Sequence, residues 1–471
     1  MTTVGLLTIS DGRPSVHQEV KDFAAGVEDR IAQRLTAADY SVVRGREAIW
    51  NNELAVSEAR RIGDARPALT IVSIPVWAFP HFTMRAAREL PGPLLLFSSI
   101  DPRYPGMVGM LAAAGALDQV EREYARAWGD IGDDAVWRQV QAHISAGEAV
   151  SRLRGSTFGR IGGRPMGMYT AVSNSDRWLQ QFGIDVEEID QWEIVRRAAG
   201  VDGGQVAHAR AWLEKNSAGV HYDGKQLTPE LLERQIRSYY VVRQLIDEWN
   251  LDFCGIKGQP ELTNHFATMD LAEAFLNDPY DWDGPKQPFV CATECDMDAA
   301  LTMQILGSLS GTPVLFADVR HYHADLDIWD LCNSGQHATW FAARSSDPLE
   351  NLSKVHLYPE EFYFPAGGAS VQHVAAPGAF TFARLSRLGE RYRMQVLGGN
   401  LEELDAETAE RLSRASTYVW PHAFARFTAS ADEILGRFGS NHIHAVPGDQ
   451  VPALRAVCRL LGIDFDGMGA V

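Results

Sequence analysis

Two carboxylates flank one short stretch of this sequence, at a spacing that suits a shared site. Glu294 follows the apolar run Phe289–Thr293, and Asp318 follows the run Thr312–Ala317. We interpret the stretch as strand, helix (Ala299–Ser308) and strand, in which each carboxylate ends a strand. A right-handed crossover would put both strands in one parallel sheet, so both carboxylates would emerge at the same edge. Two such oxygen ligands predict a site for Mn2+, with Mg2+ or Co2+ as alternatives, although each could instead cap a helix or meet water.

A second cluster, Ser440-Asn441-His442-Ile443-His444, could add an imidazole ligand to such a site. In an extended segment we expect only one of the two histidines to face a given site. A lone histidine in a folded protein is more often structural than a ligand. The spacing alone therefore leaves both interpretations of His442 open.

The cysteines give no sign of a thiolate metal site or of a disulfide framework. They are few and odd in number, namely Cys254, Cys291, Cys295, Cys332 and Cys458. No CxxC pair occurs, and Cys291 and Cys295 lack the second pair that a thiolate site needs. This usage is typical of reduced thiols in a cytoplasm.

Composition and charge exclude several classes of function. The formal net charge of -18 argues against a nucleic-acid partner, because such binding needs a basic face. No apolar run approaches the roughly 18 residues that a membrane span needs. The N-terminal run Val4–Ile9 lacks a basic leader and is typical of a first strand rather than of a secretory signal. We therefore expect a cytoplasmic protein.

The first 120 residues alternate between two kinds of pattern. Strand-like runs cover Val4–Ile9, Tyr40–Val43, Leu69–Pro75 and Pro93–Ser98, and helical patterns cover Val16–Ala38, Leu54–Ile62 and Met84–Leu90. Strands that alternate with helices predict a parallel sheet built from βαβ units. Ligands of such sheets bind at the carboxyl ends of the strands.

The alternation continues to about residue 310 and then changes. A helical pattern over Pro229–Asn250 precedes the apolar strand Phe253–Ile256. Beyond residue 311, glycine turns separate strand-like runs such as Ala379–Leu385 and Tyr392–Val396, which indicates antiparallel pairing. We predict an α/β fold with two doubly wound parallel-sheet domains, residues 1–155 and 156–310, followed by a C-terminal mixed, largely antiparallel β-barrel-like domain, residues 311–471.

Five segments resemble motifs of one enzyme family. They are Ala292-Thr293-Glu294 with Phe316-Ala317-Asp318-Val319-Arg320, then Ser440-Asn441-His442, Ile161–Gly167 and Gly255–Leu262. Through them the sequence resembles the L-fucose isomerase family, which also acts on D-arabinose, and more distantly the L-arabinose isomerases. The resemblance runs over nearly the whole chain.

The resemblance implies a metal-dependent aldose–ketose isomerase that acts on an open-chain sugar through an ene-diol intermediate. The substrate would be L-fucose, D-arabinose or a related aldose. Glu294 and Asp318 would bind Mn2+ and exchange protons with the sugar, and His442 would be the third metal ligand. Sugar-binding residues carried over from the family are Arg13, Gln259, Ser334, Trp420, Asn441 and Trp77. It also implies a homo-oligomer, a hexamer or trimer, in which Trp77 reaches a neighbouring subunit's site.

Other interpretations of these residues remain open. Arg13 could form a surface ion pair, the tryptophans could pack in a core, and Gln259 could cap a turn. His337 could correspond to an extra histidine of the arabinose isomerases. The family shows other residues where this chain has His321 and His323, and the chain is shorter than typical members, so the sugar could differ from L-fucose.

The rival function is a non-catalytic cytoplasmic sugar-binding α/β protein, since similar folds serve both purposes. A protein that only binds sugar has no need of two carboxylates and an imidazole on one metal, so these residues weigh against that alternative. A nucleotide-dependent oxidoreductase is disfavoured because no GxGxxG follows the first strand.

Overall fold

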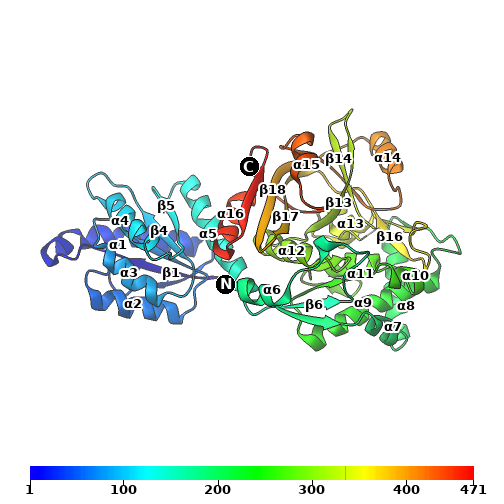
Figure 1. Ribbon diagram of the computed structural model, residues 1–471, viewed down its shortest axis with the longest axis horizontal. Coiled ribbons are helices and arrows are strands. Elements are labelled where there is room, and N and C mark those ends of the chain that lie inside the picture. Colours follow the sequence, from blue (N-terminus) through cyan, green and yellow to red (C-terminus); the bar gives the residue numbers. More distant parts are fainter. Residues whose placement is uncertain (335) are drawn as a thin grey trace. The chain divides into compact units, whose positions relative to one another are not determined.

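The computed structural model describes residues 1–334 and 336–471 (Figure 1). The chain separates into two compact units. The first comprises Met1–Arg152 with Pro452–Leu460, and the second comprises Leu153–Val451 with Leu461–Val471. Among the described residues, no helix combines the length and the apolarity needed to cross a membrane.

The first unit is a five-stranded parallel sheet with strand order β2-β1-β3-β4-β5. Its strands are β1 (Thr3–Thr8), β2 (Ser41–Arg44), β3 (Leu69–Ser73), β4 (Leu94–Ser98) and β5 (Ala125–Trp128). Its helices are α1 (Pro14–Ala37), α2 (Asn52–Asp64), α3 (Pro80–Glu89), α4 (Gly106–Asp118), α5 (Asp134–Leu153) and most of α16 (Val451–Leu461). The predicted parallel sheet of the N-terminal region is confirmed.

Both faces of this sheet are buried, which explains why its strands are continuous apolar runs. Leu6 of β1 packs in one core with Ile31 of α1. Leu7, the next residue, packs in the opposite core with Ile62 of α2 and Phe82 of α3. Successive side chains of a strand alternate between faces, so this pattern requires helices on both sides.

The second unit begins with another parallel sheet, of four strands in the order β12-β9-β6-β7. Its strands are β6 (Thr157–Ile161), β7 (Asp185–Ile189), β9 (Phe253–Ile256) and β12 (Cys291–Thr293). The helices of this region are η1 (Tyr169–Ala171), α6 (Ser175–Phe182), α7 (Trp192–Ala198), α8 (Gly203–Asn216), α9 (Pro229–Trp249), α10 (Glu261–His265), α11 (Asp270–Asn277) and α12 (Met297–Ser310).

The rest of the second unit is dominated by a seven-stranded mixed sheet in the order β17-β20-β13-β14-β19-β18-β21. The strands are β13 (Leu315–His323), β14 (Ile328–Cys332), β17 (Gly378–Leu388), β18 (Arg391–Leu401), β19 (His422–Phe427), β20 (His442–Pro447) and β21 (Asp464–Met468). All pairs are antiparallel except β18 with β21. The hairpin strands β17 and β18 also pair with each other over their full length.

Smaller elements complete the second unit. A three-stranded sheet joins β8 (Gly219–Val220), β15 (His356–Pro359) and β16 (Ala369–Gln372), and a short hairpin joins β10 (Tyr280–Asp281) and β11 (Gly284–Pro285). The remaining helices are η2 (Thr339–Ala342), α13 (Pro348–Leu352), α14 (Ala406–Ala415) and α15 (Ala431–Arg437).

The strands that carry the two predicted carboxylates do not share a sheet. Glu294 follows β12 of the parallel sheet, whereas Asp318 lies in β13 of the mixed sheet. The prediction of one βαβ unit in a single parallel sheet is therefore wrong. Helix α12 connects two different sheets instead. Asp318 also lies inside its strand rather than at its end, because β13 continues to His323.

Candidate metal and active site

The second unit brings Glu294, Asp318 and His442 together. Glu294 Oε2 lies 3.0 Å from His442 Nε2, and Asp318 Oδ1 lies 3.5 Å from the same nitrogen. His442 is fully buried, and Glu294 is 7% exposed. One carboxylate oxygen of Glu294 and one of Asp318 thus each lie near the same imidazole nitrogen.

Two of these side chains are placed by strand register. Asp318 of β13 lies directly opposite His442 of β20 in the antiparallel pair. Opposed residues on antiparallel strands project from the same face of the sheet. The two candidate ligands are therefore held by the hydrogen bonds of the strand ladder.

Glu294 reaches the site from a sharp turn at the end of β12. Its φ is 56° and that of Cys295 is 49°, so two consecutive non-glycine residues adopt the left-handed region. Gly255 of β9 allows the turn to pass closely, since a Cβ there would lie 2.9 Å from Cys295 Cα. Strained backbone of this kind is characteristic of functional sites.

His442 and His444 face the same side of β20, which corrects the expectation that only one of them could face the site. Residues two apart in a strand share a face. The Phe316 ring centroid lies 4.7 Å from that of His442 and 4.8 Å from that of His444. His444 is completely buried, at a position opposite Phe316 rather than Asp318.

Two buried atoms at the convergence point suit a cation. Although Glu294 Oε2 and His442 Nε2 are 3.0 Å apart, neither makes a hydrogen bond within the described residues. Leaving buried polar atoms unpaired is costly unless a ligand completes them. Two oxygens and an imidazole nitrogen form a donor set that Mn2+ accepts. The residues therefore fit a bound divalent cation.

Two residues that the sequence analysis missed, Asp296 and Arg384, hold His442 from its Nδ1 side. Asp296 Oδ2 lies 2.6 Å from His442 Nδ1, and Arg384 of β17 donates to both oxygens of Asp296, at 2.8 and 3.2 Å. Asp296 also caps α12 by accepting from the Ala299 backbone N–H. An aspartate before a helix and an arginine within the apolar stretch of the strand Gly378–Leu388 were the available signals.

The charges and the burial of these side chains shift their pKa values strongly. Burial acts to lower the pKa of His442, but the hydrogen bond to Asp296 and the nearby Glu294 carboxylate outweigh it and raise the pKa to about 10. Burial acts to raise the pKa of Asp296, yet Arg384 and His442 hold it well below its ordinary value. Burial and the charge of Glu294 raise the pKa of Asp318. The acids around His442 therefore favour its protonated form, and a cation at Nε2 would compete with that proton.

Amide side chains surround the two carboxylates. Gln259 Nε2 donates to Glu294 Oε1 at 3.4 Å, and Asn441 Nδ2 donates to Asp318 Oδ1 at 3.1 Å. Asn333, which the sequence analysis did not select, donates to Asp318 Oδ2 at 3.1 Å. Two of the sugar-binding candidates thus contact the candidate ligands directly.

Ser334 and Trp420 lie beside two buried acids, Asp270 and Glu360. Trp420 Nε1 donates to Glu360 Oε2 at 2.9 Å, and Glu360 and Ser334 both affect the pKa of Asp270. Burial raises the pKa of Asp270 to about 7 and that of Glu360 well above its ordinary value. Burial therefore favours the neutral form of both carboxyls. Gly335, which follows Ser334, lies outside the described residues.

The other two sugar-binding candidates belong to the first unit. Arg13 donates to both oxygens of Asp11, at 3.0 and 2.6 Å, so the ion-pair interpretation of Arg13 holds within this unit. Trp77 follows β3 and is partly exposed, between the buried residues Val76 and Ala78.

A different group of potential ligands, Asp330, Cys332 and His422, lies on β14 and β19. His422 Nε2 donates to the Thr417 carbonyl at 3.0 Å, and Nδ1 lies 2.8 Å from Asp330 Oδ1, so both ring nitrogens already have partners. Burial raises the pKa of the Cys332 thiol well above its ordinary value. A protonated thiol and a fully paired imidazole suit a hydrogen-bonded core cluster better than a metal site.

The ring contacts of His321, His323 and His337 are with other histidines and not with His442. The rings of His321 and His323 contact each other, with centroids 4.7 Å apart. His337 is buried, with its centroid 6.0 Å from that of His373.

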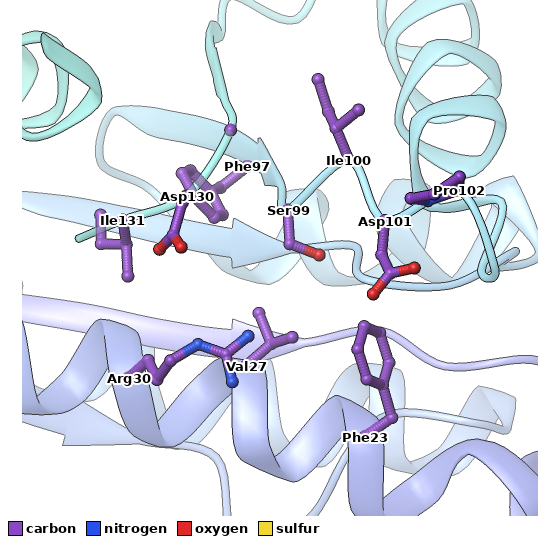
Figure 2. Close-up of a pocket in the computed structure, with 11 residues that line it drawn as sticks. Phe23, Val27, Arg30, Phe97, Ser99, Ile100, Asp101, Pro102, Asp130 and Ile131 are labelled. Carbon is purple, nitrogen blue, oxygen red and sulfur yellow. The ribbon is translucent and has the colours of Figure 1, made fainter. Parts of the chain in front are cut away.

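The first unit contains a separate hollow of about 480 Å3 at the carboxyl ends of β4 and β5. Figure 2 shows side chains of α1, among them Phe23 and Arg30, facing the loop residues Ser99, Asp101 and Asp130. None of the residues predicted for the metal site lines this hollow.

Comparison with known proteins gives consistent matches along the chain. Residues 1–155 match the family described as L-fucose isomerase, first N-terminal domain, residues 249–311 match its second N-terminal domain, and residues 331–469 match its C-terminal domain. The chain is 23% identical to the L-fucose isomerase of Citrobacter koseri, over 93% of this chain and 88% of that protein. It is 24% identical to an L-fucose isomerase of Escherichia coli over the same shares.

Proposed function

The chain belongs to the L-fucose isomerase family of aldose–ketose isomerases, and we propose that it interconverts an open-chain aldose and its ketose at Glu294, Asp318 and His442. The observation that carries this proposal is the convergence of Glu294 Oε2 and Asp318 Oδ1 on His442 Nε2, at 3.0 and 3.5 Å. A sugar-binding protein without chemistry has no use for this arrangement.

The reaction moves a proton between C1 and C2 of the sugar through an ene-diol. A divalent cation bound by the three side chains would polarise the sugar oxygens and stabilise the negative charge that develops on them. Glu294 and Asp318 both lie close to His442 Nε2, so one carboxylate can take the proton and the other can return it. Burial of Glu294 and His442 limits the access of bulk water to the reacting carbons.

We propose Mn2+ as the cation, with Mg2+ or Co2+ as weaker alternatives. The donor set is two carboxylates and one imidazole, which is harder than a zinc site built on thiolates. Cys295, the nearest thiol in sequence, donates its S–H to the Gly255 carbonyl at 3.2 Å and is thus engaged elsewhere.

The substrate is proposed to be L-fucose, D-arabinose or a related aldose. Gln259 and Asn441 have amide groups beside the carboxylates, and Ser334 and Trp420 add a hydroxyl and an aromatic ring. Such groups are the usual partners of sugar hydroxyls and of the apolar face of a sugar. The five free, buried cysteines support a reducing compartment such as the cytoplasm.

We further propose a homo-oligomer, which α4 supports. This helix is apolar on every side until Asp118, and Met107, Val108 and Leu111 are 47%, 50% and 50% exposed in the isolated chain. A helix that is apolar all round is normally buried. A second copy of the chain would cover this stripe, and in the assembly Trp77 and Arg13 would contribute to a neighbour's sugar site.

The decisive experiment measures ketose formation from a panel of aldoses, with Mn2+ and after its removal by EDTA. Turnover of L-fucose or D-arabinose that depends on Mn2+ would support the proposal. Binding of a sugar without any turnover, with Mn2+ present, would favour the non-catalytic sugar-binding protein instead.

A further inference from the structure

His442 can bind a cation through Nε2 only if its other ring nitrogen carries the proton. Nδ1 of His442 lies 2.6 Å from Asp296 Oδ2, and both side chains are completely buried. An ionised carboxylate accepts hydrogen bonds and cannot donate them. The contact therefore places a proton on Nδ1, so that when a cation binds, the lone pair offered to it is that of Nε2, which faces Glu294 and Asp318.

Asp296 is itself held in one orientation by three donors. Arg384, whose side chain is 1% exposed, donates to Oδ2 at 2.8 Å and to Oδ1 at 3.2 Å. The backbone N–H of Ala299 donates to Oδ1 at 2.9 Å. Every donor approaches a carboxylate oxygen, so the group must be an ionised acceptor on both sides.

We infer that Asp296 is a positioning residue that selects the metal-binding tautomer of His442 and fixes the direction of its imidazole, an inference that rests on the proposed function. Carboxylates that accept from a metal-binding histidine orient the ring and raise its basicity. Arg384 acts one step further away, because it fixes the rotamer of Asp296.

Replacement of Asp296 by asparagine would place this network in conflict. With its oxygen at the Oδ1 position, the amide accepts from Ala299 but turns its NH2 toward His442 Nδ1. That nitrogen would then have to accept, and the proton would move to Nε2, where it blocks the cation. With the opposite rotamer, the NH2 would face the Ala299 N–H. Neither orientation satisfies all the donors.

Asp298 offers a matched control two residues away on α12. It is also buried, at 1% exposure, and it also accepts from an arginine of β17, Arg387, at 3.0 Å. It differs in that it pairs with Arg387, whereas Asp296 also contacts His442. A loss of packing around α12 would affect both variants, whereas a loss of tautomer control would affect only Asp296→Asn.

The test is a titration of metal-free protein with Mn2+, in which electron paramagnetic resonance measures the free ion. We expect Asp296→Asn to bind Mn2+ about 10–100-fold more weakly than the unaltered protein. Asp298→Asn should bind with nearly unaltered affinity. Circular dichroism of each metal-free variant checks that it is folded. If Asp296→Asn does not fold because Arg384 is left unpaired, the double variant Asp296→Asn/Arg384→Gln removes both charges and should show the same weakening.

Each outcome separates the inference from the proposed function. Equal Mn2+ affinity in the unaltered protein and in folded Asp296→Asn would overturn the inference and leave the proposed function standing. Equal weakening in Asp298→Asn would overturn it too, by assigning the effect to packing. If the unaltered protein binds no Mn2+, the proposed metal site is wrong and the inference falls with it.

Discussion

Asp318 lies directly opposite His442 in the antiparallel pair of β13 and β20, with its Oδ1 3.5 Å from His442 Nε2. Register of this kind is fixed by the ladder and by burial of one face. Glu294 comes from a different sheet and joins the pair through a turn in which two residues have positive φ. The candidate site therefore depends on how two sheets pack within the second unit, and not on one strand edge.

Removal of either carboxylate should abolish turnover and leave the fold intact. Glu294→Gln and Asp318→Asn keep the size of each side chain but remove its charge and its ability to take a proton. General acid–base steps typically contribute about 10²–10⁴-fold to the rate, and weaker metal binding would add to this loss. Initial rates of ketose formation at saturating Mn2+ give the measurement.

The matched control for this pair is Asp330→Asn, a buried carboxylate of the same sheet whose partner is His422. If it remains folded, it should retain most of the turnover. A variant of Glu294 or Asp318 with near-normal activity would exclude that residue from the mechanism.

The Mn2+ ion should bind at the convergence of Glu294, Asp318 and His442. Crystals soaked in Mn2+ should show an anomalous peak within coordination distance of all three side chains. Asp330, Cys332 and His422 form the competing group, with ligand atoms within 4.8 Å of one another. A peak at that group and none at Glu294, Asp318 and His442 would overturn the assignment.

The chemistry of the candidate site could be predicted from sequence more readily than its architecture. Glu294 and Asp318 each follow an apolar run, and that local pattern, together with the family resemblance, selected both as candidates. The same pattern could not reveal which sheet each strand joins, because strand pairing depends on contacts far apart in the chain. Strand β12 has only three residues, and α12 leads into a new sheet rather than back to the old one.

Supporting residues were harder to find than ligands. Asp296 has the sequence signature of a helix cap, which it is, and nothing local shows that it also meets His442, 146 positions later. Arg384 in an apolar strand was a visible anomaly, but its partner Asp296 is 88 positions away. Asn333 gave no signal beyond its neighbour Ser334. Such residues emerge only when the fold brings distant segments together.

The buried carboxyl of Asp270 should make the protein less stable as the pH rises. Burial raises its pKa from 3.8 to about 7 in the folded protein, so the folded state holds a proton that the unfolded chain has already released. The stability that this proton contributes is complete below about pH 3.8 and is lost as the pH rises through about 7. Urea midpoints measured in EDTA should therefore fall between pH 5 and pH 8.

Asp270→Asn tests this assignment, because an amide does not titrate. The fall in the urea midpoint between pH 5 and pH 8 should be smaller in this variant than in the unaltered protein. Asp247, an exposed carboxylate near the end of α9, provides the control as Asp247→Asn. An unchanged pH dependence in Asp270→Asn would assign the effect to other buried acids, such as Glu273 or Glu360.

The final prediction concerns assembly through α4. If a second copy of the chain covers the exposed stripe of Met107, Val108 and Leu111, then a charge at its centre should weaken the assembly. Burying a charge without a partner costs several kcal/mol, so Leu111→Lys should dissociate at far higher concentration than the unaltered protein.

Light scattering during dilution measures the mass, while turnover is followed in the same samples. Leu435→Lys is the matched control, since Leu435 is 71% exposed on α15 and has no apolar stripe around it to suggest burial. Because Trp77 is proposed to reach a neighbour's sugar site, activity should fall together with mass. A Leu111→Lys monomer with full turnover would show that each chain completes its own site, and Trp77 would then have no part in the reaction.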